Sequence, residues 1–220
     1  MTRQARFILI FLPLACILMA LTESILSPGY VLKSTVRILL FGGTVAVYCL
    51  LFRDRELRIL FSPGQLKFAL LLSAAAFGVI LGGFALLRPL IDLEQISAGL
   101  ISSKNINPGN FPLVALYICL VNSFLEELFF RGFGYLVLRR HWQDQPAILF
   151  SAAAFSLYHV SILSGWFPLW LFLAMLLGLF VCGLLFNWLD REGMLYPSWL
   201  VHGAANAAIN LIGCVMFRIL

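Results

Sequence analysis

The amino-acid sequence predicts an all-α protein whose helices cross a membrane, and its composition, hydropathy and apolar runs support this. Of the 220 residues, 62% are hydrophobic and only 11% are charged, and the mean hydropathy is +0.98. Soluble domains usually have about 25% charged residues. So little charge cannot cover a water-facing surface, which excludes a soluble enzyme, a nucleic-acid-binding module and a disordered chain. The formal net charge of +5 comes from basic residues that flank apolar runs, a pattern typical of membrane proteins.

The first three apolar runs, 7–26, 36–52 and 68–87, are predicted to be membrane helices. A helix needs about 20 predominantly apolar residues to cross the hydrocarbon core of a bilayer. The first run is too long for a signal peptide and no small-x-small cleavage site follows it, so we expect it to be retained. Lys33 and Arg37 flank the start of the second run, and we place both at the membrane surface.

The remaining four runs, 111–138, 146–163, 166–189 and 196–217, bring the prediction to seven helices, with an eighth half-helix as the alternative. Residues 88–110 form the one long polar connection and are expected to lie outside the membrane. Short turn-forming or charged segments separate the other runs, at 27–29, 53–58, 139–141, 164–165 and 190–193.

We expect one integral membrane domain, in which 1–110 holds the N-terminal helices and the polar loop and 111–220 holds the buried polar residues. Nine of the 15 Lys and Arg residues would share one side with the N-terminus, five would lie on the other side, and Arg131 lies inside the membrane. The five are Lys33, Arg37, Arg88, Lys104 and Arg218. Because cytoplasmic loops carry the excess of basic residues, this distribution predicts a cytoplasmic N-terminus.

Two adjacent carboxylates, Glu126 and Glu127, stand inside the fourth apolar run. An acidic residue near the centre of a membrane helix costs about 2.5–3.5 kcal/mol on insertion scales. Glu127 and Arg131 are four residues apart with the acid first, which is the better geometry for an ion pair on one helix face. Glu126 is turned away by about 100° and needs another partner.

His159 in the fifth run, and His202 and Asn206 in the seventh, are the candidate partners of Glu126. Counted at 1.5 Å per residue, all four side chains lie between about 15 and 21 Å from the arginine-rich side. Asn122, one turn before Glu126, is placed to orient the carboxylate. A lone His or Asn in a membrane helix often only joins helices. Four such groups at one depth indicate function, because intramembrane ionisable residues mark functional sites.

This layer suits the hydrolysis of a peptide bond. A carboxylate beside a neutral imidazole can hold a water molecule and take its proton, which is general-base catalysis. The side chains of His202 and Asn206, one helical turn apart, offer two donors to the oxyanion that forms when water attacks a carbonyl.

Three motifs in the second half of the chain resemble those of the CPBP family of intramembrane proteases, which includes type II CAAX prenyl endopeptidases and the bacteriocin-related Abi proteins. They are Glu126-Glu127-x-x-x-Arg131, Phe155-x-x-x-His159 and His202-x-x-x-Asn206. The resemblance covers about 110–210, and it implies a helical membrane protease that uses a glutamate-activated water.

Under this resemblance Glu126 is the catalytic glutamate, His159 orients the water, and His202 with Asn206 binds the oxyanion. Glu127, Arg131, Asn122 and Phe155 are supporting residues. No metal or other cofactor is expected; zinc is possible but not favoured, because the H-E-x-x-H spacing of zinc proteases is absent. The implied substrate is a protein or peptide that reaches the membrane, prenylated or bearing a C-terminal sorting signal, and the implied location is a bacterial inner membrane.

Two alternatives to an intramembrane endopeptidase remain. One is a non-catalytic immunity or scaffold protein with the same fold. The other is a proton-coupled transporter that uses Glu126 and His159 as a relay. The lack of an internal repeat between the two halves counts against a transporter.

Overall fold

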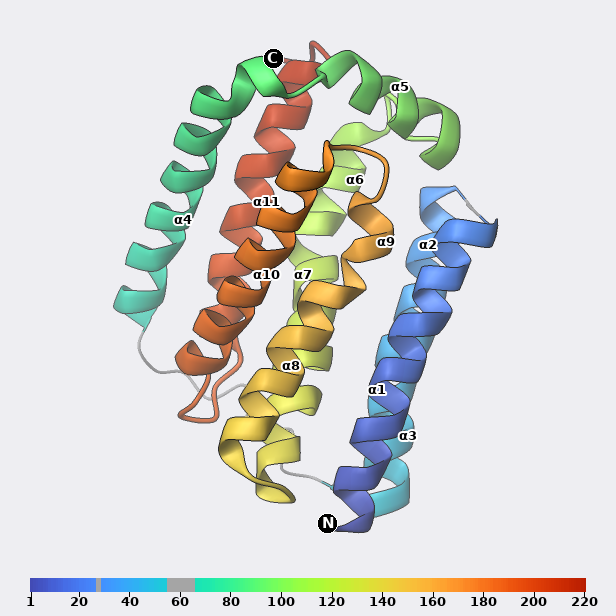
Figure 1. Ribbon diagram of the computed structural model, residues 1–220, viewed down its shortest axis with the longest axis vertical. Helices are drawn as coiled ribbons and strands as arrows, with labels where there is room; N and C mark the ends of the chain where they lie inside the picture. Colours follow the sequence, from blue (N-terminus) through green and yellow to red (C-terminus); the bar gives the residue numbers. More distant parts are fainter. Residues whose placement is uncertain (27–28, 55–65) are drawn as a thin grey trace.

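The computed structural model describes residues 1–26, 29–54 and 66–220, and its described residues form helices with no strand among them (Figure 1). Seven helical stretches are long and apolar enough to cross a membrane, which confirms the prediction of seven helices for the described part of the chain. We call them spans one to seven: Arg3–Leu26, Tyr30–Phe52, Leu66–Leu90, Phe111–Arg140, Asp144–Leu163, Leu169–Leu189 and Tyr196–Met216. The expected turn at 27–28 and the charged residues at 55–58 lie outside the described residues.

Several spans combine α-helical segments with π-helical or 3₁₀ turns. The α-helices are α1 Arg3–Leu21, α2 Tyr30–Arg37, α3 Gly43–Phe52, α4 Leu66–Leu87, α5 Leu93–Lys104, α6 Phe111–Tyr117, α7 Ser123–Glu127, α8 Asp144–Tyr158, α9 Val160–Leu163, α10 Leu169–Leu189 and α11 Tyr196–Met216. Span four has π-helical turns on both sides of α7, over Ile118–Asn122 and Leu128–Val137. Such turns are rare and frequently lie at functional sites, so they draw attention to the acidic pair between them.

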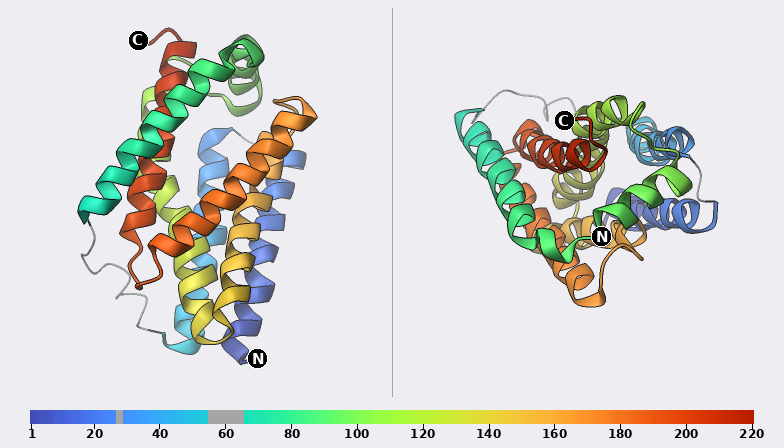
Figure 2. Two further views of the ribbon diagram at one scale, coloured as in Figure 1. Left: turned by 60° about the vertical axis from the view of Figure 1, so that its left-hand side comes forward. Right: turned by 90° about the horizontal axis from the view of Figure 1, so that it is seen from above.

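The spans pack as one bundle, with α1 to α3 on one side, α4 on the other, and α6 to α11 between them (Figure 1). The two ends of the chain lie at opposite ends of the bundle, and α5 runs across the end that holds the C-terminus (Figures 1 and 2). Aromatic rings fill the contact between spans two and four. The rings of Phe41 and Phe129 stack with centroids 4.0 Å apart, and Tyr48 packs edge-on against Phe133.

The position of Lys33 and Arg37 differs from the sequence prediction. Span two begins at Tyr30 and not at residue 36, so both residues lie within its first turns, and only 6% and 4% of their surfaces are exposed. The basic side chains are accommodated because acidic and amide groups of other helices face them: Glu23 forms an ion pair with Lys33, and Asn122 accepts a hydrogen bond from Arg37.

Candidate functional site

A cavity of about 460 Å³ lies inside the bundle, between span two, spans four to seven and one residue of α4. Its polar wall contains all four predicted catalytic residues. That wall is formed by Lys33, Arg37, Asn122, Glu126, His159, His202 and Asn206. An apolar part of the lining includes Ile80 of α4 and Met175 and Leu179 of α10. Three separate helical spans therefore bring the predicted layer to one cavity.

Glu126 is almost completely buried, with 2% of its surface exposed. Its Oε1 accepts a hydrogen bond from Asn122 Nδ2 at 2.9 Å and lies 4.0 Å from Nη1 of Arg37. The same Arg37 nitrogen donates to Oδ1 of Asn122. The Asn122 amide thus links the guanidinium to the carboxylate and fixes the orientation of both. The sequence predicted that Asn122 would orient Glu126, but it did not predict that Arg37 would lie beside this carboxylate.

His202 stands between the two carboxylates. Its Nδ1 donates to Oε1 of Glu127 at 2.7 Å, and its Nε2 lies 3.8 Å from Oε2 of Glu126. A carboxylate can only accept, so Nδ1 carries a proton and Nε2 can donate only when the ring is an imidazolium. This connection between Glu127 and His202 was not part of the sequence prediction, which gave Glu127 only Arg131.

The expected pair of Glu127 and Arg131 is present, with Oε2 and Nε 3.2 Å apart and both side chains fully buried. The guanidinium also lies over the rings of Phe155 and Phe186, at 4.0 and 4.9 Å from their centroids. Cation–π contacts of this kind are strongest when they are desolvated. Phe155, a member of the second motif, therefore packs on the arginine that holds Glu127.

His159 lies at the break between α8 and α9. Its backbone N–H turns to Ser156 O, and its ring Nδ1 donates instead to the carbonyl of Phe155 at 2.8 Å. A carbonyl oxygen accepts only, so Nδ1 holds the proton and Nε2 of the neutral ring is left as an acceptor. His159 and Glu126 both line the central cavity.

Asn206 lies one turn after His202 on α11. Its Nδ2 donates to the carbonyl of Ile118 at 3.4 Å, a long bond, and the side chain lines the cavity. The helices approach closely here because of Gly203: a Cβ at this position would lie 3.0 Å from the carbonyl oxygen of Cys119. Asn206 thus joins two helices and also has a second amide proton for the cavity.

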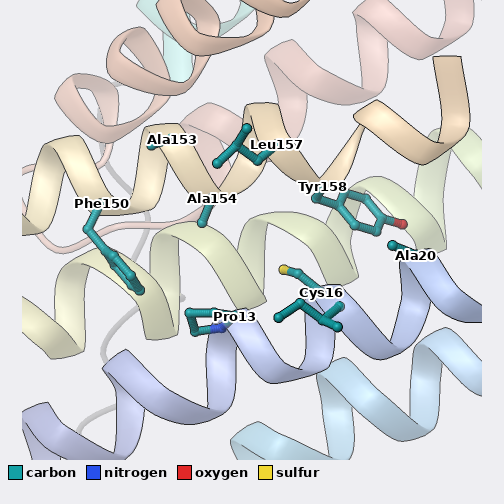
Figure 3. A pocket seen from close by; sticks show the side chains of 9 residues that line it. Pro13, Cys16, Ala20, Phe150, Ala153, Ala154, Leu157 and Tyr158 are labelled. Carbon is teal, nitrogen blue, oxygen red and sulfur yellow. The ribbon is translucent and has the colours of Figure 1, made fainter. Parts of the chain in front are cut away.

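A smaller apolar hollow of about 350 Å³ lies between α1 and α8 (Figure 3). Pro13, Cys16 and Ala20 of α1 border it on one side, and Ala154 and Tyr158 of α8 on the other. None of its lining residues is acidic or a histidine, so it does not compete with the central cavity as a candidate catalytic site.

The residues described do not include a group of three His, Cys, Asp or Glu side chains arranged to hold a metal ion. Within the polar layer, both nitrogens of His202 face carboxylates and Nδ1 of His159 is bound to a carbonyl.

Fold and site together define a helical membrane protein with a buried carboxylate–imidazole layer beside an internal cavity. Residues 108–208 match the family model described as Rce1-like type II CAAX prenyl endopeptidase, the kind of protein that the three motifs resemble. The match confirms the resemblance seen in the motifs and indicates a membrane peptidase. It contains every catalytic and supporting residue named from the sequence, whereas Lys33 and Arg37 lie before it. Comparisons with curated proteins and with solved structures gave no match.

Proposed function

We propose that this protein is an intramembrane endopeptidase that hydrolyses a peptide bond of a membrane-associated protein or peptide with water activated by Glu126. The observation that carries this proposal is the buried Glu126 carboxylate, which borders a cavity together with an acceptor nitrogen of His159. A buried carboxylate that serves only packing has no need of a cavity at its side.

In the proposed reaction a water molecule donates one hydrogen bond to Glu126 and one to Nε2 of His159. Glu126 takes a proton, and the hydroxide adds to the scissile carbonyl carbon. The resulting oxyanion accepts hydrogen bonds from the Asn206 amide and from Nε2 of His202 in its imidazolium form. The tetrahedral intermediate collapses, the C–N bond breaks, and the protonated Glu126 gives its proton to the leaving amine.

Glu127 and Arg131 act through His202 in this mechanism. The 2.7 Å hydrogen bond from Nδ1 of His202 to Glu127 sets the ring orientation, and Arg131 balances the charge of Glu127. Both are positioning residues, and neither is proposed to touch the substrate.

We propose that the protein lies in a bacterial inner membrane with a cytoplasmic N-terminus, that its partners are the substrate and the lipid bilayer, and that it needs no cofactor. The cofactor proposal is tested by dialysing purified protein against EDTA. Activity is expected to persist; loss of activity that zinc restores would contradict it.

The test of the catalytic proposal starts from a strain that lacks the protein, in which uncleaved substrate is identified by mass spectrometry of membrane peptides. Re-expression of the wild type should restore cleavage, and Glu126→Gln should not, although it inserts normally. Glu94→Gln, on the exposed face of α5, is the matched control and should cleave like the wild type. Normal cleavage by Glu126→Gln would overturn the mechanism. If a Glu126→Gln, His159→Ala double variant restores the phenotype of the strain, a non-catalytic role is indicated.

A further inference from the structure

The region before residue 108, which the family match does not cover, contributes two cations to the cavity. We infer that Lys33 and Arg37 form a binding subsite for a carboxylate of the substrate, either the free α-carboxylate of its C-terminus or the side chain of Asp or Glu. This inference rests on the proposed function, because it assigns the subsite to the same substrate that Glu126 cleaves.

Lys33 and Arg37 are four positions apart on one face of span two, and both line the cavity that holds Glu126. Each is more than nine-tenths buried. Buried cations need acceptor groups around them, because removing a charge from water is costly.

The cluster around Lys33 carries excess positive charge. Lys33 Nζ lies 2.6 Å from Oε2 of Glu23, and Lys104 pairs with Oε1 of the same carboxylate. One carboxylate therefore serves two ammonium groups, which leaves a formal charge of +1. Each ammonium has three donor protons, so Lys33 retains donors beyond the one directed at Glu23.

Arg37 also has unused donor capacity. Its Nη1 is directed at Asn122 and Glu126, but its buried Nε has no hydrogen-bond partner within residues 1–26, 29–54 and 66–220. Leaving a buried donor unpaired costs free energy, more so for a charged group. An incoming carboxylate can accept from Arg37 and Lys33 together, and charge-assisted hydrogen bonds of this kind are about twice as strong as neutral ones.

The spacing relates this subsite to the scissile bond. Arg37 adjoins Glu126, and Lys33 lies one helical turn further, about 5.4 Å along the axis. An extended peptide advances about 3.3 Å per residue. A carboxylate bound at Lys33 thus lies roughly two residues from the bond that Glu126 attacks. The apolar wall of Ile80, Met175 and Leu179 faces the same space and suits hydrophobic side chains between the two points.

The test measures binding instead of cleavage. Three fluorescent peptides of the same hydrophobic sequence are compared with purified protein in nanodiscs: a free C-terminal acid, its C-terminal amide, and an amide that carries an internal aspartate two residues from its end. We expect the acid to bind the wild type about tenfold more tightly than the amide. If the aspartate peptide binds like the acid, a side-chain carboxylate occupies the subsite; if it binds like the amide, the α-carboxylate does.

The variants separate binding from folding. Lys33→Gln should reduce the ratio of acid to amide affinity to about one, whereas Lys33→Arg should retain it. Lys104→Gln is the matched control, because Lys104 shares Glu23 with Lys33 but does not line the cavity. An unchanged ratio in Lys33→Gln, or an equal loss in Lys104→Gln, would overturn the subsite. If the protein cleaves its substrate but binds the acid and amide peptides equally, the subsite is refuted and the proposed protease activity stands. If it binds the acid more tightly than the amide but cleaves no substrate, the proposed protease activity is refuted and the subsite stands.

Discussion

Glu126 and Glu127 are neighbours in the chain but contact different groups, because successive side chains of a helix point about 100° apart. Glu126 faces the cavity with Asn122 and Arg37, and Glu127 is enclosed by His202 and Arg131. Of these two adjacent residues, Glu126 can therefore meet a substrate in the cavity, whereas Glu127 positions the imidazole of His202.

Glu127→Gln is expected to lower stability as well as activity, because it leaves the fully buried Arg131 without its counter-charge. Removing one partner of a buried pair typically costs about 3–5 kcal/mol. Thermal unfolding in detergent should show an earlier transition than in Glu126→Gln, whose amide oxygen can still accept from Asn122. Equal unfolding temperatures in the two variants would argue against this role of Glu127.

Asp190, in the turn between α10 and α11, gives the protein a pH-dependent stability. Burial, aided by the negative charge of Glu127, raises the pKa of Asp190 well above its usual value, although Ser198 donates to both carboxylate oxygens at 2.5 and 3.2 Å. Since the folded pKa is the higher one, the unfolded chain loses its proton first. Stability should therefore fall as the pH rises from about 4 towards the folded pKa.

Asp190→Asn is expected to remove this part of the pH dependence, because the amide does not titrate. Thermal unfolding between pH 4 and pH 8 measures the difference from the wild type. Asp92→Asn, at the exposed N-terminus of α5, serves as the control and should keep the wild-type slope. A wild type whose stability rises across this range relative to Asp190→Asn would contradict the assignment.

Among the helices, the close approach of α8 and α10 is set by one glycine. A Cβ at Gly183 would lie 2.9 Å from Cα of Ala152, a backbone atom that cannot turn aside. The neighbouring contact is polar: Ser151 donates to the carbonyl of Phe130 at 2.8 Å, and Asn187 donates to that of Ile148 at 3.0 Å. The first bond holds α8 against span four and the second holds α10 against α8, and α10 supplies much of the apolar cavity wall.

Gly183→Ala is expected to destabilise the protein by about 1–3 kcal/mol, the usual effect of overpacking. Thermal unfolding and the amount of protein in the membrane both report it. Gly82→Ala on α4, where an added Cβ meets nothing within 4 Å, should be neutral or slightly stabilising. If both variants behave alike, the α8–α10 contact is more adaptable than its geometry indicates.

At the scale of the whole molecule, the distribution of basic residues is expected to set the orientation. Lys33 shares Glu23 with Lys104 of α5, so it lies at the end of the bundle opposite the N-terminus, as the count of nine against five assumes (Figure 1). Arg55 and Arg58, two of the nine, lie outside the described residues. The cytoplasmic N-terminus stays a prediction.

Reporter fusions test this orientation. Alkaline phosphatase joined after Leu220 should be active, and joined after Gln143, in the turn between spans four and five, it should be inactive. The reverse pattern would place the N-terminus outside. Joined after Asn107, which follows α5 in the chain, the reporter should be active like the fusion at Leu220, because α5 and the C-terminus lie at the same end of the bundle (Figure 1).

The seven spans could be predicted from sequence because each needs only a long apolar run, a local property. The layer of Glu126, His159, His202 and Asn206 could be predicted because charge and depth are also counted along single helices. Arg37 could not, since a basic residue near the end of an apolar run can either reach the membrane surface or turn inwards. The choice depends on Asn122 and Glu126, on a helix far along the chain. The only local sign was the shortness of the run 36–52.

The distance of 85 positions between Arg37 and Asn122 has a consequence for biosynthesis. A helix that emerges during translation enters the bilayer in chain order, so the guanidinium of span two is already in place when the acidic pair of span four arrives. The nascent chain therefore never has to shelter Glu126 without a counter-ion. The imidazole of His202 comes with span seven. Under the proposed function, the protein is therefore inactive until its last span has been inserted.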